Sequence, residues 1–318
     1  NYTVKLITPS KKDFLIKNLK FKFERKAEIH GMCVELLTNN KEFKEMWEDN
    51  FDPMSNTVRP HCRILTLDDK KLKKNTVFYE PISKTVFLYN FDYYGWVKSI
   101  ALAAASDFIE DYQSIHRRGY VHGACLDFMG KGIAIVGPPK TGKTTLSYGL
   151  LANIKNSKLV ADDWFFVKIT AIDCIAYMSE RNSYIQKDLS ENWPVFKPLV
   201  KETKFDFMQR GVANVAEIIG KDRIRHTTVL NHLFVLQRDK NEKRTFYHVE
   251  KNFALNYLIK NNFCNPHFLV KDRRKEKLRI SFFKLLLNKI GVSFINTIST
   301  PNKTLEEVKK YLKKCNYF

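Results

Sequence analysis

The chain of 318 residues is 44% hydrophobic and 28% charged, which supplies enough apolar material for a folded core and excludes a disordered chain. Twelve glycines and ten prolines are too few for a fibrous or low-complexity protein, and no run approaches the ~18 apolar residues of a membrane span. The formal net charge of +20 favours an anionic partner, although a lysine-rich surface without a partner explains it equally well.

The first 115 residues predict an N-terminal α/β region. Side chains alternate between apolar and charged in Leu19–Phe23, which indicates a strand, and Phe43, Met46 and Trp47 recur at helical spacing. The expected strands are Val4–Thr8, Leu19–Phe23, Cys33–Leu37, Arg63–Leu67, Thr76–Glu80 and Val86–Tyr89, and the expected helices are Lys41–Asp49 and about Trp96–His116.

Residues 116–318 predict a second α/β region. Its expected strands are Gly132–Val136, Lys158–Ala161, Phe165–Ile169, Val229–Gln237 and Val292–Ile298, and its expected helices are Thr144–Lys155, Phe253–Asn261, Lys275–Lys289 and Thr304–Lys314. Thr304, with Glu307 three residues later, predicts a capping box at the start of the last helix.

The strongest motif is a phosphate-binding loop at Gly137–Thr145, between an apolar strand and a helix. In such a loop the glycines let backbone N–H groups face a polyphosphate, and the helix N-terminus adds a positive dipole. Lys143 would reach the β- and γ-phosphates, and the Thr144 hydroxyl would bind magnesium. The expected nucleotide-binding residues are Gly137, Lys140, Thr141, Gly142, Lys143, Thr144 and Thr145.

A pair of carboxylates, Asp162 and Asp163, ends the apolar strand Lys158–Ala161. A carboxylate at a strand tip can hold magnesium or accept a proton. Asp162 lies only 19 residues after Lys143, so the acidic strand must directly follow the helix of the phosphate loop.

Before the loop, a hairpin of Ala124–Phe128 with Ile133–Val136 would bring His122 near the phosphates.

These three motifs together resemble the catalytic domain of HPr kinase/phosphorylase. His122-Gly123, the turn at Gly130–Gly132, the phosphate loop and Ala161-Asp162-Asp163 follow one another as they do in that family. The resemblance, which covers about residues 119–170, implies a mixed-sheet fold related to phosphoenolpyruvate carboxykinase and an α/β N-terminal extension.

The resemblance also implies active-site roles and an assembly. His122, Lys143, Thr144, Asp162 and Asp163 match family positions, with Asp162 expected as the general base and Asp163 near the metal. Ser179–Tyr184 stands where the family has a signature stretch, which makes Glu180 a magnesium ligand and Arg181 a phosphate ligand. ATP and Mg²⁺ are the implied cofactors, and a homo-oligomer is the implied assembly.

The last third of the chain carries most of the excess charge. Residues 221–318 hold 22 Lys+Arg and 8 Asp+Glu (+14), whereas residues 1–220 hold 32 and 26 (+6). Arg273, Arg274 and Lys277 are therefore candidate contacts to an anionic acceptor, such as a phosphorylated metabolite, a protein or RNA. The alternative is an amphipathic helix whose Leu278 and Phe282 pack on the sheet while its cations face solvent.

Three functions remain open at this point. The first is an ATP- and magnesium-dependent kinase that phosphorylates a hydroxyl of a protein serine or a small molecule. The second is an RNA-directed kinase or another nucleic-acid-binding NTPase that uses the basic third, and the third is a nucleotide-binding module without catalysis. Six scattered cysteines without a metal-ligand spacing, and no visible secretory signal, lead us to expect reduced thiols in a cytoplasmic protein.

Overall fold

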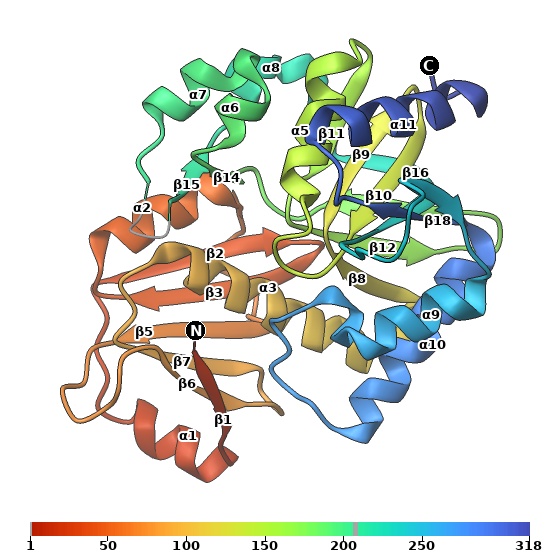
Figure 1. Ribbon diagram of the computed structural model, residues 1–318. Coiled ribbons are helices and arrows are strands. Elements are labelled where there is room, and N and C mark those ends of the chain that lie inside the picture. Colours follow the sequence, from red (N-terminus) through yellow and green to blue (C-terminus); the bar gives the residue numbers. More distant parts are fainter. Residues whose placement is uncertain (1, 206–208) are drawn as a thin grey trace. The chain divides into compact units, whose positions relative to one another are not determined.

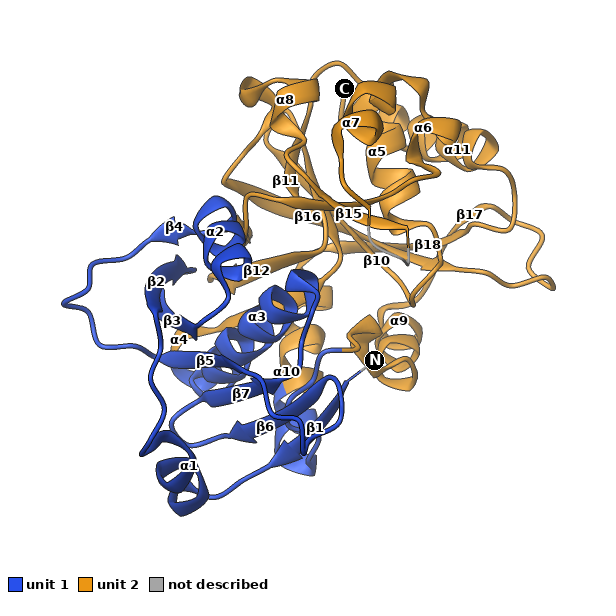
Figure 2. Cartoon of the chain, turned by 90° about the vertical axis from the view of Figure 1, so that its left-hand side faces the viewer, with its two compact units in different colours: residues 1–115, 267–278 blue, residues 116–266, 279–318 orange. Residues whose placement is uncertain are grey.

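The computed structural model describes residues 2–205 and 209–318, which form two compact units. Unit 1 comprises residues 1–115 and 267–278, and unit 2 comprises residues 116–266 and 279–318 (Figure 2). The segment 267–278, which the sequence analysis assigned to the second region, therefore belongs to unit 1. Both units combine helices with sheets that contain parallel and antiparallel strand pairs, which confirms an α/β protein with mixed sheets.

Unit 1 is built on a seven-stranded sheet in the order β1-β6-β7-β5-β3-β2-β4 (Figure 1). The strands are β1 Thr3–Leu6, β2 Phe23–Ile29, β3 Met32–Thr38, β4 Asp52–Pro53, β5 Cys62–Leu67, β6 Thr76–Glu80 and β7 Thr85–Tyr89. The helices are α1 Pro9–Ile16, α2 Lys41–Asn50 and α3 Tyr94–Asp111, and the short α4 Gln113–His116 spans the boundary between the units.

In unit 1 one sequence prediction was wrong and one helix was not predicted. The strand expected at Leu19–Phe23 begins only at Phe23, because Leu19 and Phe21 lie in a loop and pack with Leu15 of α1 against the sheet residue Phe87. A loop that packs on an apolar surface can alternate apolar and charged residues as a strand does, because its apolar side chains face that surface and its charged side chains face solvent. Helix α1 was missed, although Thr8 caps it by accepting a bond from the N–H of Lys11.

Unit 2 is built on a nine-stranded sheet among the described residues. Its main path runs β11-β9-β10-β16-β13-β12-β8, and β18 pairs with both β16 and β17. The sheet strands are β8 Arg118–His122, β9 Ala124–Phe128, β10 Lys131–Val136, β11 Ser157–Ala161, β12 Trp164–Ile169, β13 Cys174–Met178, β16 Thr227–Gln237, β17 Phe246–His248 and β18 Gly291–Asn296. A separate hairpin pairs β14 Ser183–Gln186 with β15 Arg210–Ala213.

Helices cover both faces of the sheet in unit 2. They are α5 Lys143–Asn153, α6 Leu189–Asn192, α7 Lys197–Glu202, α8 Ala216–Ile219, α9 Lys251–Lys260 and α11 Pro301–Lys314, with 3₁₀ turns at Pro194–Phe196, Lys221–Arg223 and Asn262–Cys264. Helix α10 Arg273–Lys289 begins in unit 1 and enters unit 2 at Arg279. Ile295 shares one core with α5 and α11, whereas its neighbour Phe294 contacts Tyr257 of α9. Because successive strand residues face opposite sides, α9 packs on the face opposite to α5 and α11 (Figure 1).

The cap predicted for the last helix was also wrong. Helix α11 begins one turn earlier, at Pro301, and Thr300 is its N-cap, with its side chain accepting from the N–H of Lys303. Proline at the first helical position favours that earlier start, and Thr304 lies buried inside the helix.

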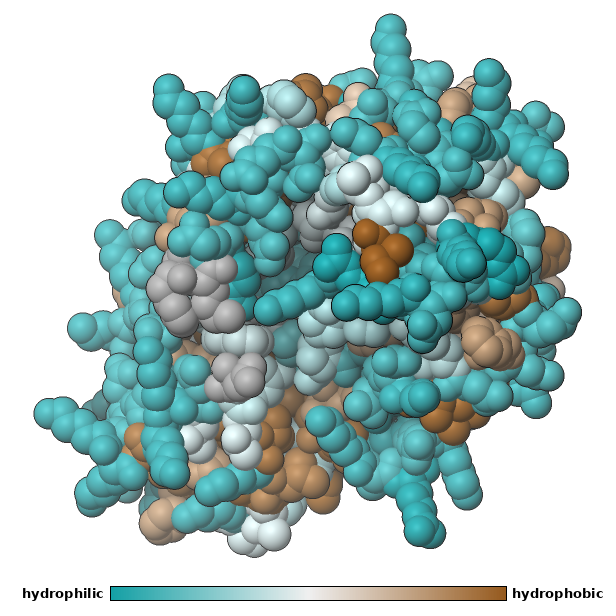
Figure 3. All heavy atoms as spheres, viewed as in Figure 1, coloured by the Kyte–Doolittle hydropathy of each residue, from teal (hydrophilic) through white to brown (hydrophobic). Residues whose placement is uncertain are grey.

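The six cysteines are all free thiols. No helix of the described residues has the length and apolar character to cross a membrane. Hydrophilic side chains predominate on the face shown in Figure 3, where hydrophobic residues form small, scattered groups.

Candidate active site

The predicted hairpin before the phosphate loop is confirmed. β9 and β10 pair antiparallel, with Phe128 opposite Lys131, and β10 pairs parallel with β16 on its other side. The glycine turn that joins them includes Gly130, whose φ of +92° lies in the left-handed region. β10 then leads into the phosphate loop at its carboxyl end, where open α/β sheets place their ligand sites.

The loop Gly137–Thr145 has the backbone that a phosphate cradle needs. A Cβ on Gly137 would lie 2.6 Å from Thr141 Oγ1 and 2.9 Å from the carbonyl oxygen of Leu236. A residue with a side chain would therefore clash at this position. Lys140 and Gly142 have φ of +65° and +90°, which turn the chain into α5. Thr141 is tied down on both sides, because its hydroxyl donates to Pro138 O and its carbonyl accepts from Thr297 Oγ1.

The N-terminus of α5 is suited to an anion. Gly142 is the N-cap and has no side chain to accept from the first-turn N–H groups, and the first turn holds no acidic residue. An α-helix provides no internal acceptor for those N–H groups, so they point to whatever lies before the helix. Gly149 of the same helix packs on the indole of Trp193, whose Nε1 donates to Thr145 O and fixes the helix in place.

Lys143 is folded back on its own loop. Its Nζ donates to Gly137 O at 2.9 Å and to Pro138 O at 3.3 Å. Burial lowers the pKa of Lys143, and the charges of Asp163 and Asp162 oppose that shift. A polyphosphate would provide the anionic partner that this partly buried ammonium lacks within its loop, which fits the group that the motif predicts.

The carboxylate pair follows β11 as predicted, but β11 pairs with β9 rather than with the strand of the phosphate loop. Asp162 is buried and accepts the backbone N–H of Tyr184 on Oδ2 at 3.0 Å. Asp163 keeps 30% of its side chain exposed. The two adjacent acids thus differ in environment, one enclosed and held by the backbone and the other open to solvent.

His122 lies directly beside Asp163. β8 pairs with β12 so that His122 stands opposite Trp164, and the backbone N–H of Gly123 donates to Asp163 O. The Nε2 atom of His122 is 3.3 Å from Asp163 Oδ1, and Nδ1 is 2.9 Å from Cys264 O. A carbonyl oxygen only accepts, so Nδ1 carries the proton and Nε2 is the nitrogen that faces the acid.

Glu180 and Arg181 are placed near the acid pair by bonds on either side of them. Ser179 Oγ donates to Trp164 O, and the N–H of Tyr184 donates to Asp162, so the intervening segment runs alongside Asp162-Asp163. Glu180 is buried and Arg181 is exposed. Thr144, at the first turn of α5, is partly exposed. Mg²⁺ bound to phosphates needs only one or two carboxylates, and Asp163 and Glu180 are the acids of this segment that could supply them.

The structure does not gather all predicted residues in one unit. Arg273, Arg274 and Lys277 belong to unit 1, whereas the phosphate loop, His122 and both acids belong to unit 2. Arg273 and Lys277 are exposed, and Arg274 pairs with Asp111 at 2.8 Å. Sequence reasoning missed Tyr184 and Cys264, which contact the site through backbone atoms and therefore leave no signature in residue type.

No family model and no curated protein sequence matches the chain. Among solved structures, one similar chain is the HPr(Ser) kinase/phosphatase from Coxiella burnetii. The similarity covers 62% of this chain and 97% of that chain, with 15% sequence identity and a TM-score of 0.35. It names the same family that the sequence motifs resemble.

Proposed function

We propose that this chain is an ATP- and magnesium-dependent kinase that transfers the γ-phosphate to a hydroxyl group. The observation that carries the proposal is the contact of His122 Nε2 with Asp163 Oδ1, at 3.3 Å. The charges of Asp163 and Asp162 also act on the partly buried ammonium of Lys143. A module that only binds nucleotide needs the cradle and the lysine. It has no need of two acids and an oriented imidazole beside them.

Each side chain has a role that its environment allows. Lys143 and the first-turn N–H groups of α5 bind and neutralise phosphate oxygens, and Thr144, Asp163 and Glu180 hold the metal. Asp162, held by the Tyr184 N–H, accepts the proton of the acceptor hydroxyl. His122 presents Nε2 beside Asp163. When bound, Mg-ATP supplies the phosphoryl group, and the protein positions the reactants and balances their charge.

The decisive experiment follows labelled γ-phosphate from ATP into cell-extract fractions that are separated into protein, RNA and metabolite pools. We expect label in one pool with the wild-type chain and none with Lys143→Ala. Label in RNA would favour the nucleic-acid-directed kinase, and that transfer should also fall steeply with salt. ATP binding without transfer to any pool would instead identify a non-catalytic nucleotide-binding module.

The acceptor side and the compartment are also parts of the proposal. Exposed Arg273 and Lys277 are the residues we assign to an anionic acceptor, because each can pair with a phosphate or carboxylate, whereas Arg274 is engaged with Asp111. Six free thiols, five of them buried, suit a reducing compartment, so we assign the kinase to the cytoplasm.

A further inference from the structure

The 3₁₀ turn after α9 has an unusual backbone. Asn262, Phe263 and Cys264 have φ of +49°, +54° and +56°, three consecutive residues in the left-handed region without a glycine among them. Each L-residue meets a steric penalty there, because its Cβ approaches the following carbonyl oxygen. Such a backbone persists only where its surroundings dictate it, and it is found preferentially at functional sites.

The surroundings of this turn hold it firmly. The N–H of Cys264 donates to Asn261 O at 2.8 Å, and the N–H of Asn265 donates to Asn262 O at 3.0 Å. Phe263 and Cys264 are buried, and the Phe263 ring stacks on Phe283 of α10 with 5.1 Å between centroids. The turn is therefore anchored both by its own backbone and by the core of unit 2.

This backbone conformation sets the direction of the Cys264 carbonyl group. Cys264 O lies 2.9 Å from His122 Nδ1, across 142 positions of the sequence. The edge-on contact between the rings of His122 and Trp164, at 5.5 Å between centroids, restricts the imidazole from another direction. Because the carbonyl can only accept, it selects a proton on Nδ1 and leaves Nε2 toward Asp163.

The same residue borders the phosphate loop. Burial raises the pKa of the Cys264 thiol to about 12, and the charge of Lys143 opposes that shift. Cys264 is thus linked to two side chains of the site: its thiol feels the charge of Lys143, and its carbonyl accepts from His122 Nδ1.

We propose that the left-handed turn Asn262–Cys264 is a positioning element for phosphoryl transfer. The carbonyl of Cys264 orients the His122 ring so that Nε2, and not Nδ1, meets Asp163 beside the phosphate loop. Cys264 is a positioning residue, because it acts through His122, and this role rests on the kinase function proposed above.

The first test uses the wild-type chain and does not depend on turnover. ¹⁵N-labelled histidine is incorporated, and the His122 signals are assigned by their loss in His122→Asn. We expect a hydrogen-bonded proton on Nδ1 of His122. A His122 ring protonated on Nε2 alone would overturn the proposal. Should the wild-type chain transfer no phosphate, the kinase proposal fails while this spectrum still decides the orientation of the ring.

The second test varies the backbone preference at one position. Cys264→Gly, Cys264→Ala and Cys264→Val keep the carbonyl and differ in how well they tolerate a positive φ, valine being the worst because it is β-branched. We expect glycine and alanine to stay within about 3-fold of the wild-type kcat, and valine to lower kcat by ~10- to 100-fold with the KM for ATP within about 2-fold, as a displaced catalytic group does. The valine variant should also lose the Nδ1 proton signal.

The matched control is Asn316→Val. Asn316 is an exposed residue of unit 2 with φ of +55°, which reproduces the backbone strain away from His122. We expect it to lose melting temperature without losing kcat. An equal loss of kcat in both valine variants, or an unchanged kcat in Cys264→Val, would refute the positioning role. If Cys264→Val does not fold, the wild-type spectrum remains decisive.

Discussion

The backbone N–H of Tyr184 lies 3.0 Å from Oδ2 of Asp162 and donates to it. A strand that follows the acid pair by some twenty residues of sequence thus holds one of its two carboxylates, while the other, Asp163, faces His122 and solvent. The two acids are chemically alike and become different only through their neighbours. This difference is the basis for assigning the base to Asp162 and the metal to Asp163.

We expect Asp162→Asn to keep its fold, because the asparagine carbonyl still accepts from Tyr184, and to lose turnover by ~10²–10⁴-fold, because the amide accepts no proton. Asp163→Asn should raise the magnesium concentration needed for half-maximal rate. Steady-state kinetics at varied magnesium distinguish the two effects. Asp173→Asn, which alters an exposed acid of unit 2, is the control, and full activity in both site variants would refute the assignment.

Lys143→Ala should abolish nucleotide binding or turnover, because it removes the ammonium group of the phosphate loop. Titration calorimetry with ATP measures the binding directly. Lys155→Ala removes the same charge from an exposed position just after α5 and should leave the affinity unchanged. Equal ATP affinity in wild type and Lys143→Ala, with equal turnover, would show that the loop is not the nucleotide site.

Two glycines provide a comparison within one unit. Gly142 and Gly130 have φ of +90° and +92°, and an added Cβ meets no atom within 4 Å at either. Gly142→Ala and Gly130→Ala should therefore cost similar stability, about 1–2 kcal/mol each from backbone strain. Only Gly142→Ala should weaken ATP binding, because only that glycine begins α5. Equal ATP affinities in the two variants would contradict a phosphate cradle at this helix.

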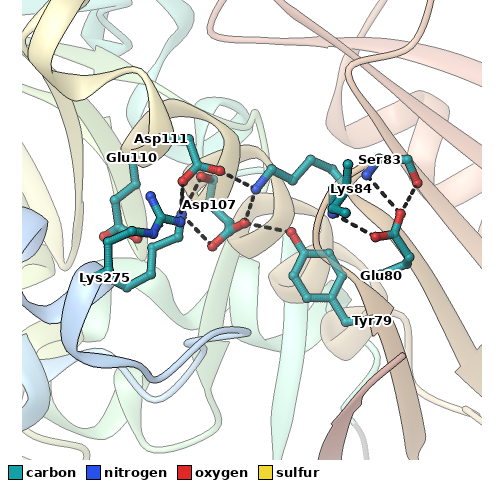
Figure 4. A network of polar contacts seen from close by, with 10 residues as sticks. Tyr79, Glu80, Ser83, Lys84, Asp107, Glu110, Asp111 and Lys275 are labelled. Atoms are coloured by element: carbon teal, nitrogen blue, oxygen red, sulfur yellow. Dashed lines mark hydrogen bonds and ion pairs between the residues drawn. The ribbon is translucent and has the colours of Figure 1, made fainter. Parts of the chain in front are cut away.

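Unit 1 contains a buried network of charges that predicts its response to acid (Figure 4). Lys275 contacts Asp107, Glu110 and Asp111, and Lys84 bonds Asp107 and Asp111, with Tyr79 donating to Asp107. Burial alone would raise the pKa of Asp111, but hydrogen bonds from Lys275, Lys84 and Arg274 hold it well below its usual range. Burial would likewise lower the pKa of Lys84, but Asp107 and Asp111 raise it.

The sign of the pH dependence follows from these shifts. A carboxyl group whose pKa is lower in the folded chain than in the unfolded chain stabilises the fold at pH values above its unfolded pKa, which is about 3.9. This stabilisation is lost as the pH falls through the pKa of the folded state. We expect urea unfolding to show constant stability near neutrality and a loss below about pH 4. Asp111→Asn should be less stable at pH 7 and should lose less in acid. Parallel curves for the two chains would exclude Asp111 as the titrating group.

The exposed cations Arg273 and Lys277 provide a test of whether the acceptor is anionic. Lys275 is committed to the buried network and is left intact, whereas Arg273 and Lys277 are exposed. Arg273→Gln with Lys277→Gln should raise the KM for an anionic acceptor by ~10-fold or more and leave the KM for ATP within about 2-fold. Lys309→Gln with Lys313→Gln, on α11, removes equal charge elsewhere. An unchanged KM for the acceptor would show that Arg273 and Lys277 only face solvent.

Local signals predicted the centre of unit 2 well. The strand before the phosphate loop, the loop, α5 and the acid pair are contiguous in sequence, and each has a strong pattern of glycines, apolar runs or carboxylates. The hairpin of β9 with β10 was predictable because a glycine turn separates two short apolar segments. These features depend on neighbours along the chain, which the sequence displays directly.

The features that escaped prediction depend on distant neighbours. Lys275 reads as one more cation in a basic run, and only its position against the acids of α3 makes it a buried residue. Cys264 reads as an apolar residue near the end of a helix, yet its carbonyl meets His122. Leu19 and Phe21 alternate like a strand but pack from a loop. In each case tertiary packing overrides the local pattern.

The return of residues 267–278 to unit 1 sets an order for biosynthesis. Lys275 is separated from Asp107 by 168 positions, so the ribosome releases the acids of α3 long before their buried cation. Domains usually fold as they emerge, N-terminal first. Unit 1 instead gains Lys275, the cation that Asp107, Glu110 and Asp111 share, only after most of unit 2 has been translated. The completion of unit 1 during synthesis is therefore timed by the translation of unit 2.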